Sequence, residues 1–126
     1  MGVWLHDLGN PENKLKINWW NWRPTIEIIR DFHLIDDLRL EMMGFNGNTI
    51  ITVEEARVIG KRIQDEVLPK IPQGGRMMLD QSVVYAPDDG TFYREESENF
   101  KNYSASSEWL QKFSAFCLIS QGFDVG

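Results

Sequence analysis

Two stretches near the start of the chain alternate apolar and polar side chains. The first covers residues 3–8 and the second residues 15–19, and a period of two is typical of strands that bury one face. Gly9-Asn10-Pro11 between them has the composition of a turn, because Gly permits a positive φ and Pro fixes its own φ. The pattern therefore predicts a β-hairpin formed by residues 3–8 and 15–19.

The apolar spacing then becomes helical. Pro24 is compatible with the first turn of a helix, where the missing N–H has no partner within the helix, and either Asn21 or Arg23 would lie near the cap. We expect a helix over residues 22–34, with His33 as a hydrogen-bonded core histidine on its apolar face. Four residues separated by four, three and four positions share that face: Trp22, Ile26, Ile29 and His33.

The strongest local signal in the chain is a capping box at Thr52 and Glu55. In this motif the threonine hydroxyl accepts the glutamate N–H, and the glutamate carboxylate accepts the threonine N–H. Apolar residues follow at helical spacing until Pro69. The pattern predicts a helix over residues 53–68. Since only one face of this helix is apolar, we expect that face to pack against the core and the other face to remain in solvent.

Local signals assign the remaining segments. Asp36 can cap a short helix that ends at Gly44, and residues 49–51 are prone to form a strand. Residues 77–93 surround a Pro-Asp-Asp-Gly turn and predict a β-hairpin or a pair of short strands. The last helix should run from Ser106 or Ser107 to Ser120.

A left-handed Gly122 is expected after the last helix, with Phe123 packing back on Leu118. The predicted class is therefore α+β with a helical majority, built from three to four helices and short strands or hairpins at residues 3–8/15–19 and 77–93.

Composition sets limits on this picture. A chain of 126 residues fits one domain spanning residues 1–126. Its single cysteine, Cys117, excludes an internal disulfide framework and a cysteine-rich zinc site. The chain has no apolar run of the roughly 20 residues that a membrane-spanning helix needs. Because residues 1–10 lack the pattern of a secretory signal, we expect a cytoplasmic protein.

The net charge of −6 limits the classes of molecule that the protein is expected to bind. Residues 1–63 carry 8 basic and 9 acidic side chains, whereas residues 64–126 carry 5 and 10. Without a basic face, binding to nucleic acid or to an anionic membrane is not expected. Acidic residues are densest between positions 88 and 98, where the segment is either a solvated loop or a docking surface for a basic protein. The five acidic residues are Asp88, Asp89, Glu95, Glu96 and Glu98.

Five tryptophans are the most unusual feature of the composition, and such clusters either fill a core or stack on ligands. Trp19 and Trp20 would point to opposite sides of an extended chain. We therefore expect Trp20 to be exposed and to belong to a ligand or partner surface.

Other candidate chemistry is sparse. His6 and Asp7 are adjacent in a predicted strand, so their side chains should point to opposite faces and form a poor relay. Cys117 lies among apolar residues, which makes a thiol inert. The sequence has no His-x-x-x-His spacing, phosphate loop or nucleophile elbow. We expect no catalytic residues, no metal site and no cofactor.

The chain closes with a Trp-Leu…Phe-Cys…Gly-Phe motif, formed by Trp109-Leu110, Phe116-Cys117 and Gly122-Phe123. It also has an early tryptophan-bearing helix and a central Thr/Ser-x-Glu-Glu/Asp-Ala motif, carried by Thr52 to Ala56. In these motifs the chain resembles a family of small uncharacterised bacterial proteins. The resemblance covers most of residues 17–125 and implies a bacterial, cytoplasmic, single-domain protein. No activity or catalytic residue is implied by the resemblance.

These observations favour a non-enzymatic, acidic interaction protein of the inhibitor or immunity type that docks on a basic partner. The alternative is a small enzyme or ligand-binding domain, in which His33 or His6 would serve an aromatic-walled pocket near Trp20 or Trp22. A homodimer without a ligand is a third option.

Overall fold

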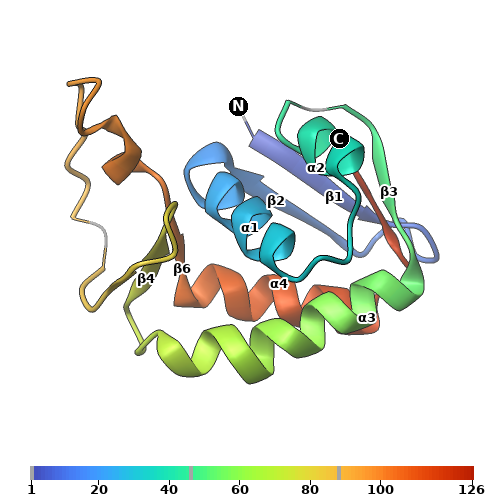
Figure 1. The fold of residues 1–126 in the computed structure, drawn as a ribbon. Helices are drawn as coiled ribbons and strands as arrows, with labels where there is room; N and C mark the ends of the chain where they lie inside the picture. Colours follow the sequence, from blue (N-terminus) through green and yellow to red (C-terminus); the bar gives the residue numbers. More distant parts are fainter. Residues whose placement is uncertain (1, 46, 88) are drawn as a thin grey trace.

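The computed structural model describes residues 2–126 except Asn46 and Asp88. These described residues form four α-helices and two antiparallel sheets, which confirms the α+β class (Figure 1). The α-helices are α1 (Trp19–Asp31), α2 (Asp37–Met43), α3 (Val53–Arg62) and α4 (Ser107–Ile119). The larger sheet has the order β2-β1-β7-β3, with strands β1 (Gly2–Asp7), β2 (Lys14–Asn18), β3 (Thr49–Ile51) and β7 (Phe123–Val125). The smaller sheet has the order β5-β4-β6, with strands β4 (Arg76–Met78), β5 (Val83–Val84) and β6 (Ser104–Ser106).

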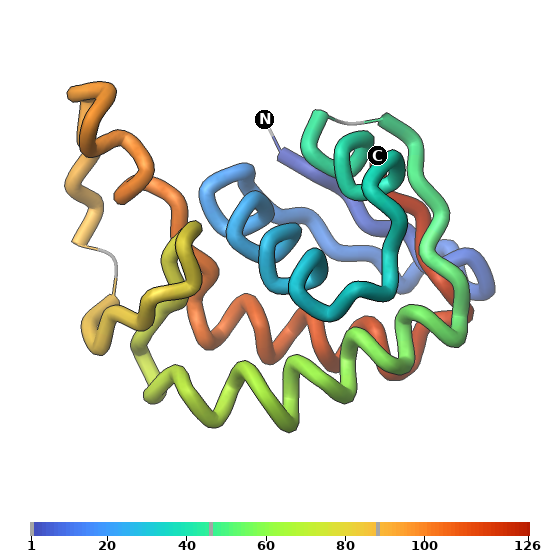
Figure 2. The backbone as a smooth tube through the Cα atoms, in the orientation of Figure 1, coloured from blue at the N-terminus to red at the C-terminus, as the bar shows by residue number. Residues whose placement is uncertain are grey.

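The predicted N-terminal hairpin is confirmed. Strands β1 and β2 pair antiparallel, and Val3 and Leu5 are fully buried while Trp4 and His6 face solvent. The alternation seen in the sequence therefore marks the two faces of the sheet. The buried face packs against the helices (Figure 2).

The structure has a C-terminal strand, β7, that the sequence did not predict. Gly122 has the expected positive φ of +86°, but Phe123 does not simply close the helix by packing back on Leu118. It begins a strand that pairs with β1 on one side and β3 on the other. Three residues are too few to show a period of two, so the pattern of the sequence did not reveal this central strand.

Helix α1 begins earlier than residue 22. The Asn18 side chain accepts the Asn21 N–H at 2.9 Å and caps the helix, so Trp19 is its first residue rather than the end of a strand. Pro24 consequently lies inside the helix, beyond the first turn.

The prediction for His33 was wrong. The helix ends at Asp31, and His33 follows it with a φ of +56° and an exposed side chain. The change in backbone direction takes the imidazole off the apolar face of the helix.

The capping box at Thr52 and Glu55 is present, and it begins α3 as expected. The Glu55 carboxylate also accepts two hydrogen bonds from the Arg39 guanidinium, at 2.7 and 2.6 Å, which ties α2 to α3. These hydrogen bonds hold the pKa of Glu55 below its usual value. The helix continues as a wider turn over Ile63–Val67 and a 3₁₀ turn over Leu68–Lys70.

The smaller sheet corrects the prediction for residues 77–93. Strands β4 and β5 give the expected pair of short strands, but the chain turns between them at residues 79–82 and not at the Pro-Asp-Asp-Gly sequence, and residues 85–93, apart from Asp88, contain no strand. The third strand, β6, was not predicted. It is held against α1, because the Asn21 side-chain oxygen accepts the Ser106 N–H at 3.0 Å.

Aromatic rings join α1, α4 and the larger sheet. Trp22 of α1 meets Phe113 of α4 edge-on at 5.7 Å between ring centroids, and Phe113 meets Phe123 of β7 at 6.1 Å. All three side chains are fully buried. The Trp109 Nε1–H donates to the Thr25 hydroxyl at 2.8 Å, so the polar edge of this buried indole is satisfied.

Among the helices of residues 2–45, 47–87 and 89–126, none combines the length and the apolar character needed to cross a bilayer.

Helices α3 and α4 lie side by side (Figure 1), and Gly60 sets how closely they approach. A Cβ placed on Gly60 would lie 2.8 Å from the Ser114 carbonyl oxygen and 2.9 Å from Leu118 Cγ. We expect Gly60→Ala to lower the free energy of unfolding by about 1–3 kcal/mol, although alanine favours helices, because the added methyl group overpacks the interface. Urea unfolding measures this difference, and a stabilised variant would contradict the close approach.

The buried Asp7 carboxylate connects three parts of the chain. It accepts the Gly9 N–H at 2.9 Å, the Asn13 side-chain N–H at 2.8 Å and the Gln121 N–H at 3.0 Å. Burial alone would raise the pKa of Asp7, but the hydrogen bonds from Asn13, Gln121 and Gly9 outweigh it and hold the pKa below its usual value.

A carboxyl group whose pKa is lowered by folding stabilises the protein above its unfolded pKa, which is about 4, and loses that contribution as the pH falls through the folded pKa. We expect Asp7→Asn to lower the free energy of unfolding by about 1–3 kcal/mol at pH 7. The difference from the unmodified protein should shrink below about pH 4. Urea unfolding at pH 7 and pH 3 tests this, and an equal difference at both values would contradict it.

Candidate functional site

Residues 85–103 form a segment that we call the arm. It leaves the smaller sheet after β5, extends beside the helical body and returns into β6 (Figure 1). Its only regular element among the described residues is a 3₁₀ turn, Asn99–Asn102. One residue of the arm, Asp88, lies outside the described residues.

Apart from Asp88, the predicted site residues belong to the arm or, for Trp20, lie against it. Trp20, on the first turn of α1, is 39% exposed, as the sequence predicted. Its ring lies 5.8 Å from Phe92 and 5.0 Å from Tyr103, both in the arm. The structure therefore brings Trp20 next to the acidic segment from which it is separated by about 70 positions in the sequence.

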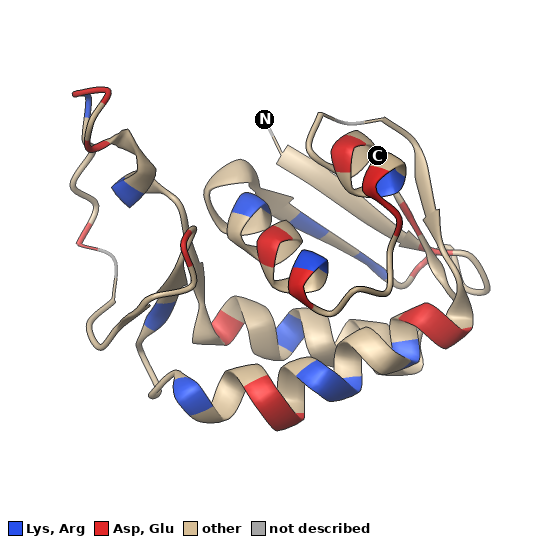
Figure 3. Ribbon diagram, viewed as in Figure 1, with Lys and Arg blue, Asp and Glu red and all other residues tan. Residues whose placement is uncertain are grey.

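Acidic residues recur along the ribbon of the arm (Figure 3), and Asp89, Glu95, Glu96 and Glu98 are exposed. Hydrogen bonds from Thr91 hold the pKa of Asp89 below its usual value, and Glu98 pairs with Lys101 at 3.1 Å. Within the described part of the chain, Glu95 and Glu96 form no ion pair. Their charges are thus free to act on a molecule that approaches the arm.

The sequence did not identify three aromatic residues of the arm that the structure shows to be exposed. Tyr85 is 78% exposed, Phe92 is 58% exposed and Phe100 is 41% exposed. The available sequence signal was that these aromatic residues lie in or beside an acidic segment without helical or strand periodicity, where no core face is expected to bury them. Large apolar side chains concentrated on one exposed segment are typical of interaction surfaces.

Asn102, near the C-terminal end of the arm, is hydrogen-bonded to Tyr93 in the middle of the arm. Its side-chain oxygen accepts the Tyr93 N–H at 2.8 Å, and its side-chain N–H donates to the Tyr93 carbonyl at 2.8 Å. Asn102 is buried. These two hydrogen bonds resemble those between paired strands, and they give the arm a defined shape although its described residues contain no strand.

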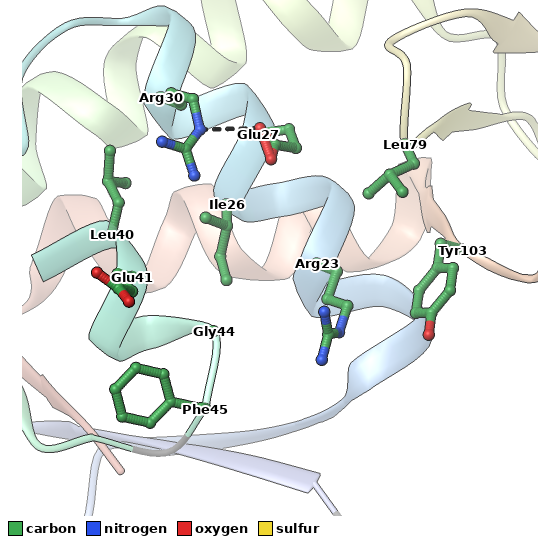
Figure 4. Close-up of a pocket in the computed structure, with 10 residues that line it drawn as sticks. All are labelled: Arg23, Ile26, Glu27, Arg30, Leu40, Glu41, Gly44, Phe45, Leu79 and Tyr103. Atoms are coloured by element: carbon green, nitrogen blue, oxygen red, sulfur yellow. Dashed lines mark hydrogen bonds and ion pairs between the residues drawn. The ribbon is translucent and has the colours of Figure 1, made fainter. Parts of the chain in front are cut away.

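A groove lies beside the base of the arm, between α1 and α2 (Figure 4). It has a volume of about 370 Å³, with Ile26 and Leu40 in its apolar floor and Arg23, Arg30 and Glu41 among its charged residues. Tyr103 contributes to the wall of the groove and also contacts Trp20. The groove and the arm are therefore neighbouring surfaces.

The remaining candidate residues lie elsewhere. His6 stacks on the Trp4 ring at 5.9 Å between centroids on the outer face of the sheet, whereas Asp7 points into the protein, as the strand geometry predicted. Neither His6 nor His33 lines the groove. Trp22 is fully buried and cannot form the wall of an open pocket.

Cys117 is fully buried, and burial raises the pKa of its thiol, which keeps the sulfur protonated. In the described ranges, no group of three or more His, Cys, Asp or Glu side chains could hold a metal ion.

No family model matches the chain, and no curated protein or solved structure matches it either. The resemblance to small bacterial proteins stays a prediction.

The role of Asn102 can be tested without disturbing the core. We expect Asn102→Ala to increase the rate of tryptic cleavage after the exposed Arg94 several-fold, because the arm loses both hydrogen bonds to Tyr93. Limited proteolysis followed by mass spectrometry measures this rate. Asn99→Ala, an exposed amide in the same turn, is the matched control, and equal rates for the two variants would contradict the assignment.

Proposed function

We propose that this chain is a non-enzymatic binding protein whose arm docks on a basic partner protein, in the manner of an inhibitor or immunity protein. The observation that carries the proposal is the combination of exposed aromatic rings and unpaired carboxylates on one segment of defined shape.

The aromatic residues would supply most of the affinity. Residues that dominate binding energy in protein interfaces are enriched in tryptophan and tyrosine, because such rings bury a large area and lose few rotamers. Trp20, Phe92 and Tyr85 present such area around the arm. Rings that stay exposed in the free protein lose contact with water when a partner covers them, which is favourable.

The carboxylates would supply the rate and the selectivity. Complementary charges raise the association rate and discriminate against partners of the same sign more than they raise affinity. Between positions 88 and 98 the sequence has five acidic residues against Arg94 alone. A partner with a basic face would therefore be steered to the arm, whereas an acidic one would be repelled.

The size of the surface is consistent with a specific complex. A typical interface takes roughly 20–30 residues from each partner. Residues 85–103, together with Trp20 and the neighbouring wall of the groove, approach this range.

The proposal is tested by affinity capture from the source organism, with the immobilised protein at low and moderate salt. We expect one basic protein that is retained at low salt, and that is lost from the variant Glu95→Gln/Glu96→Gln/Phe92→Ala. Glu12→Gln/Glu54→Gln/Leu38→Ala is the matched control, since it changes the same kinds of exposed side chain outside the arm. Equal retention by both variants would contradict docking on the arm.

The purified complex separates the two contributions. The charge changes should lower the association rate roughly ten-fold at low salt, and Phe92→Ala should mainly raise the dissociation rate. The alternative is that the arm forms the interface of a homodimer. Light scattering that gives a dimer mass for the unmodified protein and a monomer mass for Phe92→Ala would favour it.

A further inference from the structure

Arg23 is an unusual surface arginine, because aromatic rings hold it while its hydrogen-bond donors stay unused. Its guanidinium carbon lies 5.5 Å from the centre of the Trp19 ring and 5.8 Å from that of Tyr103. In residues 2–45, 47–87 and 89–126 no hydrogen bond or ion pair involves this side chain. A guanidinium held between rings keeps its planar fork of donors available for a carboxylate.

The surface next to Arg23 is apolar. Ile26 and Leu40 form the buried floor of the groove, and Phe45 and Leu79 stand at opposite ends of it (Figure 4). Its volume of about 370 Å³ lies in the range of sites for small molecules. A ligand that uses both features has an anionic head and an apolar body.

The other charges in the groove limit the number of anionic groups that a ligand can carry. Arg30 pairs with Glu27 at 3.0 Å, so these two charges compensate each other. Glu41 forms no ion pair with the described residues, and Figure 4 shows it on the far side of Ile26 from Arg23. A second negative group at that end would meet the Glu41 carboxylate.

We propose that the groove binds a small monocarboxylate with an apolar body. The carboxylate accepts hydrogen bonds from Arg23, the apolar body covers Ile26 and Leu40, and Glu41 excludes a second carboxylate. Phosphate alone would leave the exposed Phe45 ring at the end of the groove uncovered. This inference concerns the groove and does not depend on whether the arm docks on a protein.

The test is an NMR titration of the isotope-labelled protein that follows the methyl signals of Ile26 and Leu40 in the groove, which stay observable when Arg23 is replaced. The three probes have the same chain length: hexanoate, the dicarboxylate adipate and the uncharged hexanamide. We expect a Kd on the order of 1 mM for hexanoate, as suits a ligand of this size. Adipate and hexanamide should bind about ten-fold more weakly.

Three variants assign the roles. Arg23→Met should weaken hexanoate binding about ten-fold or more, and Arg23→Lys should weaken it less, because lysine keeps the charge but loses the planar fork. Glu41→Gln should bring adipate close to hexanoate in affinity. Lys112→Met, an exposed change on α4, is the control that should leave all three affinities unchanged.

Thermal melting of each variant shows whether it is folded. Equal affinities for hexanamide and hexanoate, or an unchanged affinity in Arg23→Met, would overturn the proposal. An acetylated peptide with a C-terminal leucine that binds much more tightly than hexanoate would also overturn it, since the groove would then recognise a chain end rather than a small acid.

Discussion

Trp22, Phe113 and Phe123 meet at the centre of the protein, and each comes from a different element. Their edge-on contacts fix α1 on α4 and both helices on the larger sheet. Because α1 cannot rotate without breaking these contacts, its exposed positions are fixed as well. Trp20 is thus directed to the arm, and the following turn directs Arg23 to the groove. The buried rings therefore determine the geometry of a surface to which they do not belong.

The sequence predicted the elements whose signals are local. The capping box of Thr52 and Glu55 fixes the start of α3, and Ser106 caps α4 through the Trp109 N–H. Strands β6 and β7 were not predicted, because three residues show no periodicity and each strand exists only through partners distant in the chain. The early start of α1 was missed for a related reason. The period of two continued into Trp19, whereas the Asn18 cap decided the structure.

For the candidate site, the sequence predicted which side chain is exposed better than it predicted which residues lie close together. The expectation that Trp20 is exposed followed from its neighbour Trp19, a local argument. That Trp20 meets Phe92 and Tyr103 depends on how the smaller sheet packs against α1, which no pattern in the sequence encodes. The groove was missed for the same reason, since Arg23, Leu40 and Tyr103 are brought together only by tertiary packing. The exposed position of His33 depends on where α1 ends, and the apolar spacing alone extended that helix too far.

The central place of β7 in the larger sheet has a consequence for the order of folding. Strands β1 and β3 have no direct pairing with each other, and both pair with residues 123–125, which follow them by more than 70 positions. During synthesis, the N-terminal hairpin and α3 therefore emerge from the ribosome long before the strand that unites them. Contacts of such long sequence separation slow folding because the loop must close first. Until β7 is made, β1 has an open edge that can pair with other chains, so a chaperone that shields the nascent hairpin would raise the yield of native protein.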